Sequence, residues 1–210
     1  MFESALLLTG PVDRADVARQ LSRWVSAGRL VRLRRGLYAF SESEMPGMRR
    51  PHPHEIANRL VRGSYVSLTS VLAELGDVSV FVPVTTSVTT GRPGRWDTPL
   101  GTFIYRHVKK ELFWGYGVRQ LDDGERVYVA SPEKALIDLL YLNTDCDDPA
   151  YLRQLRLQHL DRLRLDVLVT MAERVCVSRV TRAVEWVVAQ AAEDEDEWCV
   201  VPLTKKGGVT

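Results

Sequence analysis

The stretch that most constrains the fold is residues 29–40, RLVRLRRGLYAF. Leu30, Val31 and Leu33 predict one strand, and residues 37–40 predict the return strand. Gly36 permits the backbone dihedrals that a tight turn requires, and its missing side chain lets the backbone approach a ligand closely. The pattern predicts a β-hairpin with arginines at its tip.

A helix of about 15 residues is predicted directly before the hairpin. Asp13 is a good N-cap, Asp16 follows in a capping-box-like position, and Gly28 suits the position just past the end. One face is apolar and is made of Val17, Leu21, Trp24 and Val25. The other face carries Arg19, Ser22, Arg23 and Ser26. A helix followed by a cationic hairpin predicts the recognition helix and wing of a winged helix-turn-helix.

Charge is distributed unevenly although the formal net charge is only +1. Residues 14–35 contain seven arginines and one acid, Asp16, for a local net charge of +6. The opposite end carries an unbroken acidic run over residues 193–197. This run is interpreted as a solvated helix end, with contact to a basic surface as the alternative.

A basic helix and wing suit double-stranded DNA. The major groove admits an α-helix, and arginine bonds guanine edges or phosphates with two hydrogen bonds at once. A hairpin lies along the backbone or reaches the neighbouring minor groove. The alternative is a solvated amphipathic helix beside a surface hairpin.

The predicted winged helix is one helix short. Residues 2–8 (FESALLL) predict a short helix that Gly10 and Pro11 end. With residues 13–27 this gives two helices before the wing, where three are usual. The first helix is absent, is replaced by another part of the chain, or lies upstream. Residues 41–48 read as a linker.

The remaining chain predicts a block of strands followed by helices, which is typical of an α+β domain. Helices are expected over 54–61, over 68–75 with Ser67 as cap and Gly76 as end, and from Ser131 and Pro132 onward. Residues 65–66 are expected to be extended, 91–96 to form a loop and 113–118 a turn or irregular edge. Strands are expected at 78–90, 102–108 and 126–129, and further helices at 150–157, 162–175 and 179–192.

The sequence gives little support for a catalytic site or a metal site. The three cysteines are widely spaced, and His52 and His54 lack further ligands at a recognisable spacing, so we expect no disulfide framework, metal or cofactor. No common phosphate-loop, serine-hydrolase or zinc-protease motif occurs. Glu133, Lys134 and Asp138 are interpreted as ordinary surface pairing on one helix.

A second basic surface is predicted near several aromatic residues. It is either a nucleic-acid or protein surface, or a hairpin with solvated tips. Its members are Arg92, Arg95, Arg106, Lys109 and Lys110. No apolar run is long enough to span a bilayer and no secretory signal is evident, so we expect a cytoplasmic protein.

Three segments together resemble a bacterial family. GRLVRLRRGLYAF (28–40), YVSLTSVLAELG (65–76) and ASPEKALIDLLYL (130–142) look like the AbiEi-type antitoxins, which are transcriptional regulators of type IV toxin–antitoxin systems in abortive infection. The resemblance covers most of the chain. The glycine–tyrosine wing motif alone is only moderately specific for this family. The order and spacing of the three segments together are considerably more specific.

The resemblance implies a function. The N-terminal winged helix would bind inverted repeats in its own promoter and repress it, and the C-terminal domain would supply antitoxicity. The toxin would be a nucleotidyltransferase-like protein encoded next door, neutralised with or without a stable complex. The implied DNA contacts are Arg19, Arg23, Arg32, Arg34, Arg35 and Gly36. The short N-terminus departs from the family pattern, because the first helix of the family is missing.

We therefore expect a non-enzymatic repressor and antitoxin with a winged helix over 1–45, an α+β effector domain over 51–200 and a flexible tail over 201–210. Two alternatives stay open: a stand-alone winged-helix transcription factor with a sensing C-terminal domain, and a protein-interaction module that has lost DNA binding. A metal-dependent nuclease has the least support.

Overall fold

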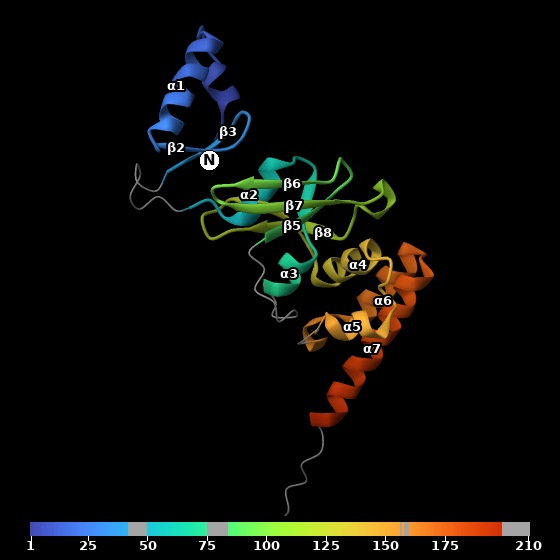
Figure 1. Cartoon of the computed structure of the whole chain (residues 1–210). Helices are drawn as coiled ribbons and strands as arrows, with labels where there is room; N and C mark the ends of the chain where they lie inside the picture. Colours follow the sequence, from blue (N-terminus) through green and yellow to red (C-terminus); the bar gives the residue numbers. More distant parts are fainter. Residues whose placement is uncertain (42–49, 75–83, 156, 158–159, 199–210) are drawn as a thin grey trace, which may run out of the picture.

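The computed structural model describes residues 1–41, 50–74, 84–155, 157 and 160–198 of the 210-residue chain. The fold is mixed α+β, with one three-stranded and one six-stranded sheet in the described residues. The winged helix-turn-helix lies at one end of the molecule and the larger sheet in the middle (Figure 1).

The N-terminal unit follows the predicted order of helix and hairpin. Its elements are β1 (Phe2–Glu3), the 3-10 helix η1 (Ser4–Leu8), α1 (Arg14–Ser26), β2 (Leu30–Arg34) and β3 (Leu37–Phe40). The strands form an antiparallel sheet in the order β1-β3-β2. Helix and hairpin are confirmed, with Asp13 capping α1 by accepting from Ala15 N at 2.8 Å.

The prediction of one short helix over residues 2–8 is wrong at its start. Phe2 and Glu3 form β1 because they pair with Tyr38 and Leu37 of the hairpin, an interaction that local sequence does not reveal. Only residues 4–8 are helical, as a 3-10 turn. The helical elements before the wing are thus the 3-10 helix over Ser4–Leu8 and the α-helix over Arg14–Ser26.

The six-stranded sheet has the order β6-β7-β5-β4-β9-β8. Its strands are β4 (Ser64–Val66), β5 (Val84–Thr89), β6 (Gly94–Thr98), β7 (Gly101–His107), β8 (Tyr116–Gln120) and β9 (Arg126–Ala130). The pairs β4–β9 and β5–β7 are parallel, and the other neighbours are antiparallel.

Two edges of this sheet differ from the prediction. The loop expected over 91–96 is wrong from Gly94 onward, because β6 pairs with β7 through Gly94–Tyr105 to Thr98–Gly101. The expected turn or irregular edge over 113–118 contains the start of β8, which pairs with β9. Both strands lie at the ends of the sheet, where few apolar residues mark them as strands.

The larger unit also contains helices. They are α2 (Pro53–Leu60), α3 (Thr69–Glu74), the 3-10 helix η2 (Lys110–Leu112), α4 (Pro132–Leu142), α5 (Pro149–Gln154), the 3-10 helix η3 (Leu160–Arg162), α6 (Leu165–Val175) and α7 (Ser178–Trp198). Ser131 caps α4 as predicted, accepting from Lys134 N at 3.2 Å. Ser67 does not cap α3 with its hydroxyl, which instead donates to the Asp138 carboxylate at 2.8 Å.

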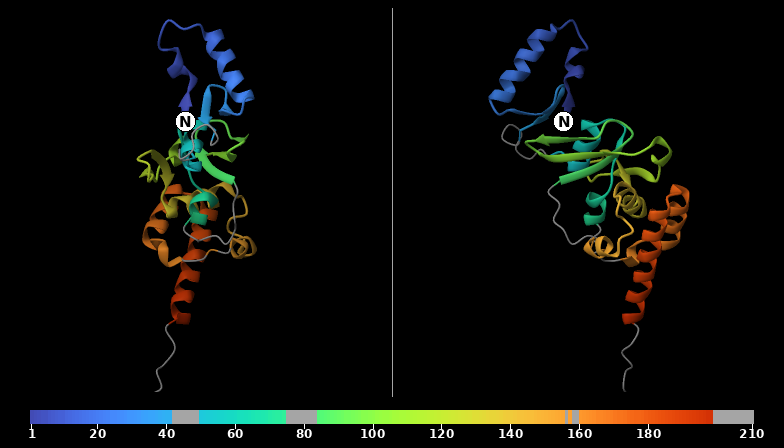
Figure 2. Two further views of the ribbon diagram at one scale, coloured as in Figure 1. Left: turned by 90° about the vertical axis from the view of Figure 1, so that its left-hand side faces the viewer. Right: turned by 45° about the vertical axis from the view of Figure 1, so that its right-hand side comes forward.

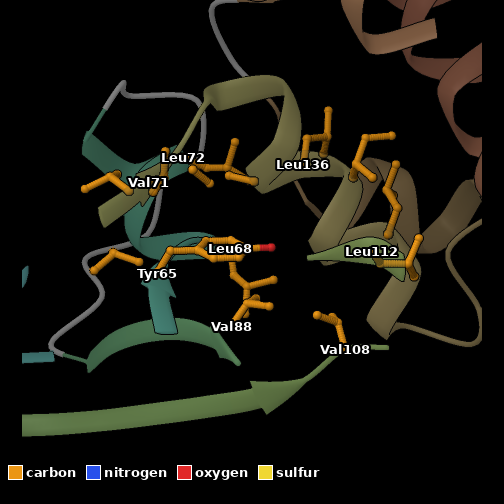
Figure 3. Close-up of a cluster of buried hydrophobic side chains, with 14 of the residues drawn as sticks. Tyr65, Leu68, Val71, Leu72, Val88, Val108, Leu112 and Leu136 are labelled. Carbon is orange, nitrogen blue, oxygen red and sulfur yellow. The ribbon is translucent and has the colours of Figure 1, made fainter. Parts of the chain in front are cut away.

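The main core lies between the sheet, α3 and α4. Figure 3 shows side chains from these elements pointing toward one another, including Tyr65, Val88 and Leu136. Complete burial of one such side chain contributes about 1.5–3 kcal/mol. This core holds the larger unit together, and two of the segments that resemble the antitoxin family lie within it.

The hairpin joins the two units. Leu33, Leu37 and Ala39 belong to the same buried cluster as the α2 residues Ile56 and Leu60. The other side of the N-terminal unit has a small cluster of its own around Leu21, Leu30 and Tyr38, with Val17, Trp24 and Val25 partly buried against it. The wing is therefore anchored on one side, and α1 stands outside the main core.

The two ends of the molecule carry opposite charge. Both views of Figure 2 place α1 at one end and the last turns of α7, which hold the acidic run 193–197, at the other. Several predictions lie outside the described residues: positions 42–48 of the predicted linker (41–48), most of the expected domain boundary near 45–51, Gly76, the first part of the strand predicted at 78–90 and the tail 201–210.

Candidate nucleic-acid interface

Helix α1 presents its polar face outward. Leu21 is buried beneath it, whereas Arg19, Ser22 and Arg23 are exposed. Arg19 also pairs with Asp16 one turn earlier, at an exposed site where such a pair is weak. Both arginines therefore retain side chains that solvent and ligands can reach.

The wing meets α1 across a hollow of about 480 Å³. Its basic lining comes from Arg14 at the start of α1 and from Arg32 and Arg35 on the wing. These three side chains are exposed. The hollow between the helix and the hairpin is thus lined by cations of the kind that bind phosphates.

Gly36 forms the turn of the wing with φ +82°, a value that residues with side chains rarely adopt. Its carbonyl accepts a hydrogen bond from Ser4 N at 2.8 Å, which ties the wing tip to η1. Gly36 also lines the hollow. The wing tip is thus held in place before any ligand binds.

Arg34 lies differently from its two neighbours. Its guanidinium donates to the carbonyls of Arg35 (3.2 Å) and Arg59 (3.3 Å) and lies 3.8 Å from the Glu3 carboxylate. These contacts turn the side chain toward α2. Arg34 therefore has a structural role, although the sequence places it with the DNA contacts.

Contacts from α2 and its C-terminal end brace the N-terminal unit. Arg62 donates to Glu3 at 2.7 Å and Arg59 donates to the carbonyl of Met1 at 3.3 Å. Together with Arg34 they fix β1, and β1 holds the hairpin. Residues that follow the wing in the sequence thus help to hold it in place.

The second predicted basic surface does not form one cluster of free cations. Arg95 pairs with Asp97 at 2.9 Å, and Arg106 donates to the carbonyl of Leu142 at 3.4 Å. Arg92, Lys109 and Lys110 are exposed. Two of the five cations are thus committed within the chain, and this surface remains a prediction.

A buried polar network joins the two other segments of the family resemblance. Asp138 accepts from Tyr65 Oη (2.9 Å) and Ser67 Oγ (2.8 Å) on one carboxylate oxygen and pairs with Lys134 on the other. Lys134 and Asp138 are each 1% exposed. Burial lowers the pKa of Lys134 and raises that of Asp138, while each partner's charge opposes the shift.

The interpretation of these residues as surface pairs is therefore wrong. The i, i+4 spacing of Lys134 and Asp138 is the same whether a helix is exposed or buried, and only long-range packing distinguishes the two cases. Gly115 belongs to the same network, because a Cβ there would lie 2.9 Å from Lys134 Cγ and its φ is +74°. Trp114 lies with its ring centre 4.8 Å from the Lys134 Nζ.

Glu133 is also buried and binds Arg164 at 3.0 Å. Burial raises the pKa of Glu133, but hydrogen bonds from Arg164, Ser131 and the Glu133 backbone together outweigh it and leave the pKa below its usual value. Glu133 thus remains charged and connects α4 to the start of α6. All three acidic and basic residues of this helix have partners within the chain.

His54 links α2, α3 and β8. Its Nδ1 lies 2.7 Å from Arg119, its Nε2 lies 3.1 Å from Glu74, and Arg119 also binds Glu74 at 2.8 Å. Burial lowers the pKa of His54 to about 4, with Glu74 opposing and Arg119 and His52 adding to the shift. No group of three or more potential metal ligands occurs among the described residues.

Stability should therefore fall as the pH is lowered from about 6.5 toward 4. Over this range histidine in the unfolded chain takes up a proton while folded His54 does not, and the loss reaches about 3 kcal/mol at the lower limit. Urea unfolding at pH 7 and pH 4.5 measures this loss of stability. His54→Gln should lose clearly less stability than the wild type over the same step. Equal losses in the two proteins would show that His54 does not cause the dependence.

Comparison with known proteins finds a family match in the N-terminal unit. Residues 7–41 match the model of a family described as transcriptional regulator, AbiEi antitoxin. The matched segment runs from η1 through α1 to the end of the wing. No curated protein matches the chain. None of the described helices is both long and apolar enough to cross a bilayer. The winged helix-turn-helix of this chain is thus similar to that of the AbiEi antitoxins, a family of transcriptional regulators.

Proposed function

We propose that the chain is the antitoxin of a type IV toxin–antitoxin system and the DNA-binding repressor of its own operon. The observation that carries the proposal is the set of exposed arginines on α1 and the wing, within a segment that matches a regulator family. The site of action is the cytoplasm, where promoter DNA is found.

In this proposal α1 enters the major groove of the promoter. Arg19 and Arg23 face base edges or flanking phosphates, because they lie on the exposed side of α1. Arg32 and Arg35 bind the sugar–phosphate backbone beside it. Arg34 is removed from the contact set, since its hydrogen bonds hold the wing to α2. The DNA consists of inverted repeats upstream of the operon.

The larger unit acts without catalysis. Lys134, Asp138 and Glu133 have the residue types of catalytic groups, but each is buried and bound to partners within the chain. The unit counteracts a nucleotidyltransferase-like toxin encoded next door, directly or only functionally. Neither proposed activity uses a metal or an organic cofactor.

The experiment separates the two activities. A reporter under the chain's upstream region measures repression, and co-expression with the neighbouring gene measures protection from its toxicity. The wild type should repress and protect, while Arg32→Ala with Arg35→Ala should protect but not repress. Absence of repression by the wild type would rule out the repressor, and absence of protection would rule out the antitoxin.

A further inference from the structure

Strand β8 is an open edge of the larger sheet. It ends the strand order, and no described strand pairs with its outer side. All five of its residues are exposed. Open edges with free backbone groups bind further strands readily.

Backbone hydrogen bonds show which residues of β8 face outward. Ser131 N donates to Gly115 O (3.0 Å) and Leu121 N donates to Glu125 O (2.8 Å), at the two ends of the β8–β9 pair. Hydrogen-bonded residues alternate along an antiparallel pair. The backbone N–H and C=O groups of the odd-numbered residues therefore point toward β9. Those of Tyr116, Val118 and Gln120 point away from the sheet.

The edge also carries exposed apolar side chains. Val118 is 58% exposed, and Tyr128, which lies opposite it on β9, is 50% exposed. Tyr116 lies on the same face, with its ring centre 6.1 Å from that of Tyr128. These three residues, here called the edge patch, line one face of the sheet up to its outermost strand.

Three of the usual protections of an edge, namely proline, lysine and a β-bulge, are missing from β8. It contains no proline or lysine, and its register with β9 is uninterrupted over all five residues. Its one charged residue, Arg119, lies on the face opposite Val118 and is bound to Glu74 and His54. No charge therefore keeps another strand away from the edge patch.

We propose that β8 pairs antiparallel with β8 of a second copy of the chain, about a two-fold axis at Val118. In this register Val118 lies opposite Val118 of the second copy, and Tyr116 lies opposite Gln120. Each outward-facing residue of β8 then lies opposite an outward-facing residue of the second copy. Each of these three residue pairs exchanges two backbone hydrogen bonds. The two edge patches join into one apolar stripe across the axis.

Self-complementarity favours a second copy as the occupant. Arg119 lies opposite Gly117 of the second copy, so no like charges lie directly opposite each other, and each Arg119 is paired with Glu74 of its own chain. A two-fold pair is self-complementary and closed, so it ends at a dimer. The role of such a dimer in DNA binding rests on the proposed function, since two winged helices related by a two-fold axis suit inverted repeats. The pairing itself is measured without DNA.

Analytical ultracentrifugation of the full chain tests the pairing. The wild type should be a dimer that dissociates on dilution. Val118→Lys and Val118→Glu should each raise the dimer dissociation constant at least about tenfold, because like charges meet at the axis. An equimolar mixture of the two variants should form dimers again, since opposite charges then face each other.

The control is Val169→Lys, which places the same charge on another exposed valine, in α6. It should dimerise like the wild type. The pairing is overturned by a wild type that is monomeric at every concentration, by charged Val118 variants that dimerise normally, or by a mixture that stays monomeric. A wild-type chain that dimerises but does not bind DNA would instead contradict the proposed function and leave the pairing of β8 intact.

Discussion

Replacing Asp138 with alanine is expected to lower the free energy of unfolding by about 3–5 kcal/mol. The substitution leaves the Lys134 charge buried without a counter-charge, which is the costly way to break a buried pair. It also removes the acceptor of Tyr65 and Ser67. Urea unfolding followed by circular dichroism measures the loss, which would unfold many domains at 37 °C.

Two further variants isolate the cause. Asp138→Asn keeps an oxygen for Tyr65 and Ser67 but removes the charge, so it should lose less stability than alanine while remaining clearly destabilised. Asp145→Ala removes an exposed carboxylate and should change stability by no more than about 0.5 kcal/mol. If Asp138→Asn were as stable as the wild type, the ion pair with Lys134 would not stabilise the fold.

Replacing Arg32 and Arg35 together with alanine is expected to weaken DNA binding at least about 100-fold at low salt. Each loses a charge-assisted contact of about 1.5–3 kcal/mol, and both side chains line the hollow beside α1. The loss should be similar on all sequences, because phosphate contacts carry no sequence information. Fluorescence anisotropy on promoter and unrelated duplexes measures both effects.

Arg34→Ala is the matched control on the same hairpin. It should leave DNA affinity nearly unchanged and lower stability instead, because its hydrogen bonds go to Arg59 and Arg35. The opposite outcome, with binding lost in Arg34→Ala and kept in the double variant, would move the interface to the other side of the wing. Melting curves of both proteins separate folding from binding.

Sequence patterns predict the local elements well. The hairpin, the Asp13 cap of α1 and the Ser131 cap of α4 all follow from side chains within a few residues of the element they define. Such signals are local because capping and turn formation depend on neighbouring backbone groups. The same reasoning places the exposed arginines of α1 correctly.

Long-range contacts explain where the observed structure differs from the prediction. Phe2 and Glu3 become a strand because the hairpin offers them a partner, and Gly94 to Thr98 become a strand because β7 does. Arg34 turns inward because α2 lies beside the wing. Asp138 is buried because Tyr65 and Ser67, about 70 residues earlier, lie beside it. None of these neighbours can be read from the local pattern.

The central claim is that the winged helix binds DNA through its exposed arginines. A salt titration of the wild-type chain on its own upstream duplex, followed by anisotropy, tests it most directly. With about four phosphate contacts, the logarithm of the binding constant should fall against the logarithm of salt concentration with a slope near −4. No binding at low salt, or a binding constant that does not change with salt, would contradict the claim.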